Sequence, residues 1–284
     1  MTDRYIPGVP CWIDTSHPDP AAAVAFYGDL FGWECENVAP ADAPAPYYIA
    51  RLRGEDVAGI GPAEGRDAVW NSYVWVEDAD ATLEKARAAG GSVLVEPMDV
   101  SEAGRSAVLA DPAGAALCLW QPGRHRGATL VNEPGTLNFN ILHTRDVESA
   151  RAFYGVVFGW DLLDEIGNFW ALPAYGDFLE ERTPGLRERI AGMGAPPRFE
   201  EVVAGLRPLT EDAPASWSVT FAVADADATA ARVTELGGRV IVPPADGPWV
   251  RMAIVADPQG AVFTASQFVP ENKDVAPEGA AAGA

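Results

Sequence analysis

The sequence predicts an α+β protein made of two tandem copies of one module, and two repeated motifs support this. Residues 26–34, Phe-Tyr-Gly-Asp-Leu-Phe-Gly-Trp-Glu, return 127 positions later as residues 153–161, Phe-Tyr-Gly-Val-Val-Phe-Gly-Trp-Asp. The tetrapeptide at residues 111–114, Asp-Pro-Ala-Gly, returns at residues 257–260 as Asp-Pro-Gln-Gly. Stretches with helix period and short β-prone runs alternate between these landmarks. A repeat of this length indicates two copies of one folding unit.

The second copy is longer than the first. The pair Gly90-Gly91 returns as Gly237-Gly238, so about 20 additional residues lie between the first helix of the second copy and this turn. We expect a first module at residues 1–125, a polar linker at 126–135 and a second module at 136–269 with an insertion at about 175–206. Residues 270–284 have little to bury and are expected to form a disordered tail.

Each copy is predicted to contain two units of strand, helix and further strands. Residues 11–15 form the first β-prone run. Asp19 can cap the following helix, and Pro20 suits its first position, where a backbone N–H is not needed. Gly32 ends this helix. Its apolar stripe follows the i, i+3, i+7 pattern, at Val24, Tyr27 and Phe31.

Further strands are expected where apolar and β-branched residues cluster, at residues 47–53, 57–60, 72–76, 93–95, 106–110 and 115–120. A second helix begins after Asp78 or Asp80 and ends at the Gly90-Gly91 pair. Residues 111–114 predict a type I turn. The second copy repeats this order from residues 138–142 to 262–266, and its insertion has helix-like stretches at about 184–191 and 199–204.

Composition excludes some classes of function. The chain has 284 residues, 48% of them hydrophobic, and a net charge of −21. Such an acidic chain would be repelled by nucleic acid and by anionic membranes, so we expect neither as a partner. The start of the chain has no basic segment followed by an apolar one, and no apolar run reaches 18 residues. We therefore expect a cytoplasmic protein.

Cysteines and histidines are few. The three cysteines lack metal-site spacing and are expected to be reduced thiols: Cys11, Cys35 and Cys118. Two histidines, His17 and His143, fall where the first strand of each copy leads into its first helix, and His125 lies where the first module meets the linker. An imidazole titrates near neutrality and could act as an acid–base group, or it could simply face water in a loop. Of the three, His143 is the better candidate, because it ends a strand.

The order of elements and the positions of Asp, Phe-Tyr, Gly-Gly and Asp-Pro-x-Gly resemble the vicinal oxygen chelate superfamily. This superfamily includes glyoxalase I, the bleomycin-resistance proteins and the extradiol dioxygenases. Residues 7–269 resemble, more closely, two-module glyoxalase-like proteins of antibiotic-producing bacteria. The resemblance implies that two βαβββ units of each module form a curved, cup-like sheet with helices outside. It does not define the activity, because this scaffold hosts isomerases, dioxygenases, lyases and binding proteins.

Enzymes of this superfamily hold a divalent metal through His, Gln or Glu side chains inside the cup. The corresponding positions of this chain carry Trp12, Asn71 and Cys118 in the first copy. The second copy has Phe139, Ser218 and Thr264 there. None of these six residues offers an imidazole or a carboxylate, and aromatic rings are no ligands for such a cation. The resemblance therefore implies no metal and no cofactor, which argues against extradiol and glyoxalase I chemistry.

Alternate residues of a strand share a face, so other side chains should join these six on the inner faces of the cups. Tryptophans near strand ends and a tyrosine of the insertion extend the set. The predicted ligand-binding residues are Trp12, Asp14, Asn71, Tyr73, Trp75, Cys118, Trp120, Phe139, Trp170, Tyr175, Ser218, Trp249 and Thr264. Flat apolar walls with a few polar groups suit a planar aromatic ligand. The competing interpretation is that these aromatic side chains form ordinary core.

The leading hypothesis is a metal-free protein that binds an aromatic or polycyclic small molecule, in antibiotic self-resistance or as an accessory to a tailoring enzyme. The alternative is a cofactor-independent lyase, isomerase or hydroxylase with Asp14 or His143 as the acid–base group. A metal-dependent enzyme with relocated ligands is a third option. The insertion would serve as a lid, or only as a cover for a sheet edge or a dimer contact. Enzymatic activity, the ligand, the number of active cups and the choice between monomer and homodimer stay open.

Overall fold

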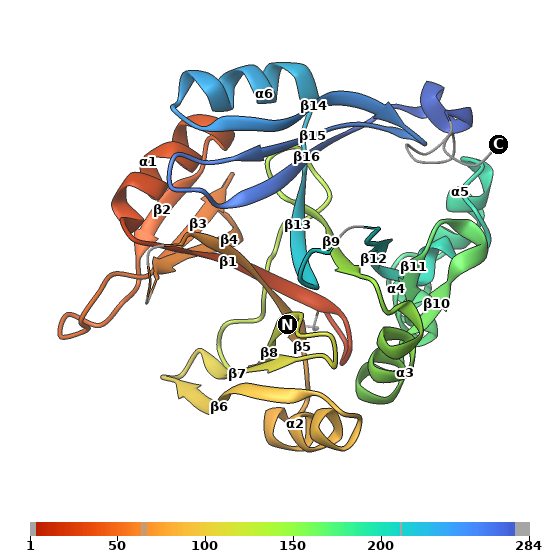
Figure 1. Ribbon diagram of the computed structural model, residues 1–284, viewed down its shortest axis with the longest axis horizontal. Helices are drawn as coiled ribbons and strands as arrows, with labels where there is room; N and C mark the ends of the chain where they lie inside the picture. Colours follow the sequence, from red (N-terminus) through yellow and green to blue (C-terminus); the bar gives the residue numbers. More distant parts are fainter. Residues whose placement is uncertain (1–3, 64, 66, 211, 276–284) are drawn as a thin grey trace. The chain divides into compact units, whose positions relative to one another are not determined.

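A computed structural model describes residues 4–275 except residues 64, 66 and 211 (Figure 1). The first copy contains two helices and eight strands in the described residues. Their order is β1 (Pro10–His17), α1 (Pro20–Phe31), β2 (Glu34–Asn37), β3 (Tyr48–Leu52), β4 (Glu55–Pro62), β5 (Val69–Trp75), α2 (Ala79–Ala88), β6 (Ser92–Val100), β7 (Gly104–Ala110) and β8 (Ala116–Pro122).

The second copy repeats this order and adds short helices between β11 and β12. Its elements are β9 (Leu137–Thr144), α3 (Val147–Phe158), β10 (Asp161–Leu163), η1 (Asp164–Ile166), β11 (Phe169–Ala171), α4 (Pro173–Arg182), α5 (Leu186–Gly192), η2 (Phe199–Glu201), β12 (Val202–Pro208), β13 (Ser216–Ala222), α6 (Ala226–Glu235), β14 (Arg239–Gly247), β15 (Val250–Ala256) and β16 (Val262–Phe268). A final 3-10 helix, η3 (Pro270–Asp274), follows.

The predicted fold class is confirmed: each copy forms one mixed, eight-stranded sheet. The strand order is β2-β3-β4-β1-β5-β8-β7-β6 in the first sheet and β10-β11-β12-β9-β13-β16-β15-β14 in the second. The pairs β1–β4 and β5–β8 are parallel, while β6–β7 and β7–β8 are antiparallel. The terminal strands of each order pair on one side only, so neither sheet closes into a barrel, which is consistent with curved cups.

Local sequence explains where the helices begin and end. The side chain of Asp19 accepts a hydrogen bond from the backbone N–H of Ala22, and Pro20 takes the first helical position of α1. Gly32 ends α1 in the left-handed conformation with φ of 74°, which glycine adopts without strain. Asp146 and Gly159 repeat both features around α3. The repeat therefore conserves the caps as well as the apolar residues.

The chain forms two compact units that do not follow the copies. The first unit comprises residues up to Trp12, Ser72–Gly127 and Phe139–Trp217. The second comprises Ile13–Asn71, Ala128–Asn138 and the chain from Ser218 onward. Within the first unit α2 packs on α3, and within the second α1 packs on α6, which covers the strands β14, β15 and β16 (Figure 1). Each unit thus combines one half of each copy.

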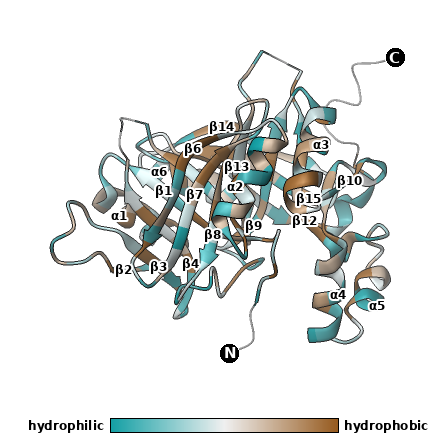
Figure 2. Cartoon of the chain, turned by 90° about the horizontal axis from the view of Figure 1, so that it is seen from below, coloured by the Kyte–Doolittle hydropathy of each residue, from teal (hydrophilic) through white to brown (hydrophobic). Residues whose placement is uncertain are grey.

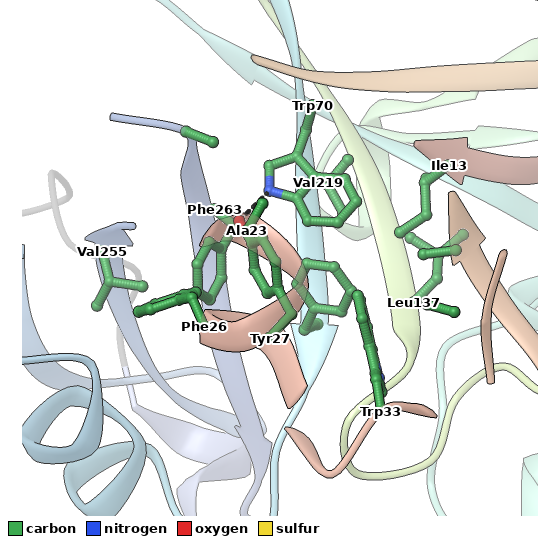
Figure 3. Close-up of a cluster of buried hydrophobic side chains, with 14 of the residues drawn as sticks. Ile13, Ala23, Phe26, Tyr27, Trp33, Trp70, Leu137, Val219, Val255 and Phe263 are labelled. Carbon is green, nitrogen blue, oxygen red and sulfur yellow. Dashed lines mark hydrogen bonds between the residues drawn. The ribbon is translucent and has the colours of Figure 1, made fainter. Parts of the chain in front are cut away.

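The repeated motifs explain this exchange. In the second unit, the Tyr27 hydroxyl donates to Oδ2 of Asp257 at 2.9 Å, and Nε1 of Trp70 donates to the Tyr27 hydroxyl at 3.2 Å. Tyr27 belongs to the first copy, whereas Asp257 belongs to the Asp-Pro-x-Gly turn of the second. Figure 3 shows this ring cluster with Trp33 and Phe263 beside it. Buried aromatic pairs contribute about 0.5–1.5 kcal/mol each beyond area burial.

The first unit contains the reciprocal arrangement. Tyr154 of the second copy donates to Oδ2 of Asp111 at 3.1 Å, and Nε1 of Trp217 donates to the Tyr154 hydroxyl at 3.0 Å. Oδ1 of Asp111 accepts the backbone N–H groups of Ala113 and Ala115, which fixes the predicted turn. Burial raises the pKa of both tyrosines well above the ordinary value. The motifs that reveal the repeat are therefore structural.

Four features differ from the sequence prediction. Residues 199–204, which have a helix-like pattern, form only the 3-10 helix η2 (Phe199–Glu201) before the strand β12 begins at Val202. The polar strand β2 was not expected, because its residues Glu34–Asn37 lack an apolar alternation. The helix α4 was also missed, since its short sequence has no clear apolar stripe and no side chain caps its start. Pro270–Asp274 form a 3-10 helix in a segment expected to be disordered, and residues 276–284 of that segment lie outside the described residues.

Within the described ranges, none of the helices combines the length and the hydropathy needed to traverse a lipid bilayer.

Candidate functional site

Strand β1 separates core residues from residues on the opposite face. Ile13, Thr15 and His17 are completely buried, and Ile13 belongs to the Tyr27 cluster. Asp14 lies on the other face, where Tyr47 donates its hydroxyl to Oδ2 at 3.0 Å and Nδ2 of Asn71 donates to Oδ1 at 2.8 Å. Two side chains therefore hold this carboxylate, as expected if Asp14 orients a bound molecule. The same bonds would also serve a purely structural carboxylate.

The aromatic residues predicted on the first-copy strands lie together in the first unit. The ring of Trp12 packs edge-on against His125 with 4.4 Å between centroids, and Trp120 lies 5.6 Å from His125. Tyr73 contacts Trp120 at 6.4 Å, and its strand position is opposite Cys118. Trp12 is only 2% exposed. His125 thus covers Trp12, which stands where the resemblance implies a metal ligand.

The corresponding strand of the second copy is more accessible. Phe139, Ile141 and His143 alternate on β9 with buried residues and are half-buried themselves. Phe139 lies 6.1 Å from Phe169 of β11, which contacts Phe199 of η2 at 5.8 Å. We call these five residues the Phe139 wall. It is an apolar, partly exposed surface within the first unit, with an imidazole at one end.

Two neighbours on β12 shape the Phe139 wall. Gly205 lies opposite Ile141, and a Cβ at Gly205 would come within 2.6 Å of Ile141 Cδ1. This glycine therefore lets the isoleucine lie across β12. Arg207 lies opposite His143. Burial, followed by the positive charge of Arg207, lowers the pKa of His143 from its ordinary value, which favours the neutral imidazole, the form that can accept a proton.

The remaining candidates of the second copy lie on β13, on β16 and in the turn before β15. Thr264 is half-buried opposite Thr220 of β13 and Ile254 of β15. Ser218 is also half-buried, near the start of β13. Trp249 stacks on Phe268 with parallel rings 6.3 Å apart, in the turn before β15. These residues offer hydroxyl groups and one exposed aromatic pair, but no carboxylate or imidazole.

Two predicted residues have other surroundings than expected. Trp170 is fully buried in the core of the first unit, 5.5 Å from Tyr154 and 5.9 Å from Trp160, rather than on an open face. Its strand β11 is only three residues long, so alternation could not assign its face. Tyr175 stacks on Phe178 within α4, and burial raises its pKa.

Trp75 is also nearly buried and lies 6.0 Å from Tyr5. It lines a cavity of the first unit to which Tyr73 does not contribute.

His17 corrects another expectation, that it occupies a loop and faces water. It ends β1, is completely buried, and its Nε2 lies 2.9 Å from Oγ1 of Thr15 and 3.4 Å from Oδ2 of Asp257. Burial lowers the pKa of His17 below 6.5 and outweighs the attraction to Asp257. The equivalent position of the second copy is Thr144, so this imidazole distinguishes the two cores.

The residues at the superfamily's metal positions do not fit a divalent cation. They provide two aromatic rings, one amide, two hydroxyls and one thiol, and burial of the thiol's strand leaves Cys118 only 7% exposed. Among residues 4–275, apart from the three undescribed positions, no three His, Cys, Asp or Glu side chains cluster as a metal site.

Comparison with known proteins decides the family. The profile of the Glyoxalase/Bleomycin resistance protein/Dioxygenase superfamily matches residues 136–264, and that of a glyoxalase-like domain matches residues 12–120. The protein CFP32 of Mycobacterium bovis, provisionally named a glyoxylase, is 39% identical over 274 residues, which cover 94% of this chain and 98% of CFP32. The chain belongs to the glyoxalase/bleomycin resistance protein/dioxygenase superfamily.

Another relative within this superfamily is the anthracycline biosynthesis protein DnrV of Streptomyces peucetius. It is 36% identical over 279 residues, which cover 92% of this chain and 94% of DnrV. Solved structures agree on the fold. The Mn(II)-bound glyoxalase of Novosphingobium aromaticivorans matches 92% of this chain and 82% of its own with a TM-score of 0.58 at 15% identity. The 2,3-dioxygenase LapB of Pseudomonas sp. KL28 matches 93% of both chains with a TM-score of 0.56 at 12% identity.

Sequence reasoning missed four residues of these surroundings. Tyr47, Phe169 and Phe199 lie in a loop or in very short elements, where no periodicity identifies a face. The fourth residue is His125, whose packing on Trp12 joins distant parts of the sequence, so no local pattern predicts it.

Proposed function

We propose that this superfamily member binds an aromatic or polycyclic small molecule in the cytoplasm without a metal ion. Its role would be self-resistance to such a compound or assistance to a tailoring step in its biosynthesis. The observation that carries the proposal is Phe139: a half-buried ring, flanked by Phe169, stands where related enzymes place a metal ligand. Stacking on such rings contributes about 0.5–1.5 kcal/mol per pair beyond area burial.

The relatives support the same class of ligand. DnrV and DauV, from two Streptomyces strains, are both named anthracycline biosynthesis proteins, and each covers most of this chain. An aromatic ligand that is handed to or from a tailoring enzyme agrees with that context. A tailoring enzyme is therefore the macromolecular partner we propose, with this chain acting as a monomer or homodimer.

A titration with the uncharged polycycle 1,4-dihydroxyanthraquinone tests the proposal. We expect saturable quenching of tryptophan fluorescence and recovery of the compound unchanged. Replacing Phe139 by Ala should weaken the affinity about tenfold, since this removes a stacking surface and its buried area. The matched control is Phe268→Ala, which removes a ring of the same size that is exposed and stacked on Trp249. Equal affinities of the two variants would contradict the proposal.

A second candidate function rests on His143. Its neutral imidazole at the end of the Phe139 wall can accept a proton from a bound substrate, so a cofactor-independent isomerase, lyase or hydroxylase is the alternative. Replacing His143 by Asn would abolish turnover in that case and only weaken binding in the first. Asp14→Asn makes the same distinction for the second acid–base candidate. Product analysis by mass spectrometry after prolonged incubation with 1,4-dihydroxyanthraquinone separates the two.

A further inference from the structure

A cavity of about 870 Å³ lies within the first compact unit and is lined by other residues than the Phe139 wall. The N-terminal segment, the ends of β5 and β8, the linker and α4 contribute to its lining. Helix α4 belongs to the insertion of the second copy, and it carries hydrophilic and hydrophobic residues together (Figure 2). The volume falls within the range of about 300–1,000 Å³ that is typical of small-molecule sites.

Three aromatic rings from distant parts of the sequence line this cavity. Tyr5 and Trp75 lie 6.0 Å apart with their planes tilted by 36°, and both are almost completely buried. Phe178 projects from α4 and is stacked on Tyr175. Rings held by their neighbours present rigid apolar walls, which favour a flat ligand at a low entropic cost.

Two arginines lie over these rings. The guanidinium carbon of Arg126 is 5.0 Å from the ring centroid of Trp75, and that of Arg182 is 5.1 Å from the ring of Phe178. When a guanidinium stacks on a ring, its N–H groups point outward in the guanidinium plane. In that plane they can donate two parallel hydrogen bonds to a carboxylate. The cavity thus combines aromatic walls with planar cationic donors.

Two carboxylates also line the cavity and limit the charge of the ligand. Glu77 and Glu181 are both exposed. Together with Arg126 and Arg182 they bring the formal charge of the lining side chains to zero. A ligand with one acidic group can meet a guanidinium, whereas a polyanion would be repelled by the two glutamates and by the net charge of −21.

We propose that this cavity is a second ligand site and that it takes a planar aromatic acid with a single carboxylate. The half-buried ring of Phe178 contacts the flat part of the molecule, and the nearly buried rings of Tyr5 and Trp75 form the floor beneath it. Arg126 and Arg182 hold the carboxylate.

The test compares two probes of the same shape, anthraquinone-2-carboxylate and the neutral anthraquinone-2-carboxamide, by calorimetric titration of the full chain. Beyond any molecule at the Phe139 wall, we expect one further molecule of the carboxylate to bind, and the carboxamide to bind in this cavity at least about tenfold more weakly, since it lacks the charge-assisted hydrogen bonds. Arg126→Met and Arg182→Met should each weaken the carboxylate about tenfold. Glu77→Gln should leave its affinity unchanged or strengthen it.

The matched control is Arg124→Met, which removes a guanidinium two residues away that pairs with Glu102 and is 80% exposed. Circular dichroism checks that each variant is folded, and Arg182 provides an independent variant on α4. Equal binding of both probes, no binding of either, or equal affinities in the Arg124 and Arg126 variants would overturn the proposal. Loss of carboxylate binding in Phe139→Ala would also overturn it, because the acid would then occupy the Phe139 wall instead.

Discussion

The two copies place different environments at the same positions of their first strand. Trp12 of the first copy is 2% exposed and packed against His125, whereas Phe139 of the second copy is half-buried beside Phe169. The same difference in burial separates Cys118 of the first copy, which is buried, from Thr264 of the second, which is half-buried. At the position where the resemblance to the superfamily implies a metal ligand, the first copy is therefore filled by its own side chains, whereas the second copy stays partly accessible.

The largest effect should come from the buried member of this pair. Trp12→Ala is expected to lower the free energy of unfolding by about 3–5 kcal/mol, because it leaves a cavity where a fully packed ring stood. Phe139→Ala should cost only about 1–2 kcal/mol, since part of the ring already faces water. Urea denaturation followed by circular dichroism measures both. Similar losses would show that the two positions do not differ in packing.

The exchanged Tyr–Asp pairs sharpen the comparison of the cores. Tyr154→Phe removes the hydroxyl that donates a hydrogen bond to Oδ2 of Asp111. It should lower the free energy of unfolding by about 2 kcal/mol, because a buried carboxylate oxygen loses this donor. Tyr27→Phe should lower the free energy of unfolding by only about 1 kcal/mol. His17 lies near Oδ2 of Asp257 and can replace part of the lost hydrogen bond. The same denaturation measurement applies. A larger loss for Tyr27→Phe would contradict a compensating role of His17.

A smaller effect concerns pH. Burial depresses the pKa of His17 below its unfolded value of 6.5, so the unfolded chain binds more protons below that pH. Stability from the neutral imidazole is thus present above pH 6.5 and is lost as pH falls, by at most about 1.4 kcal/mol per pH unit. His17→Thr introduces the residue that the second copy has at this position. It should reduce the fall in melting temperature between pH 7 and pH 5.

His143 is the matched control for this measurement, because its pKa is also depressed but its side chain is only half-buried. His143→Asn should reduce the slope less than His17→Thr. An unchanged slope in the His17 variant would mean that another group carries the acid sensitivity.

The smallest expected effect is that of metal removal. Prolonged treatment with EDTA should change neither the melting temperature nor the quenching of tryptophan fluorescence by 1,4-dihydroxyanthraquinone. A bound metal would raise the melting temperature by stabilising the folded state, but the side chains at the metal positions do not suit a divalent cation. A metal-dependent relative such as the Mn(II)-bound glyoxalase of Novosphingobium aromaticivorans provides the positive control. A fall in melting temperature, reversed by added Mn²⁺, would contradict the metal-free proposal.

The sequence predicted the fold well where local chemistry determines it. Asp19 and Gly32 define the ends of α1, and the Asp-Pro-x-Gly turns form as expected. What it could not predict is which copy supplies each partner: Tyr27 bonds to Asp257 rather than to Asp111 of its own copy, and no local pattern encodes that choice. The burial of His17 and Trp170 follows from the same long-range packing. The proposed ligand sites likewise depend on short elements such as η2 and α4, whose faces periodicity cannot assign.

The hydrogen bond between Tyr27 and Asp257 has a consequence for synthesis on the ribosome. Its two residues are 230 positions apart, so the hydrophobic cluster around Tyr27 stays incomplete until β16 has left the exit tunnel. Contacts of such sequence separation slow folding and leave apolar surface exposed meanwhile. The nascent first copy, with Tyr27, Trp33 and Trp70 not yet covered by β16, is therefore expected to be prone to aggregation during synthesis.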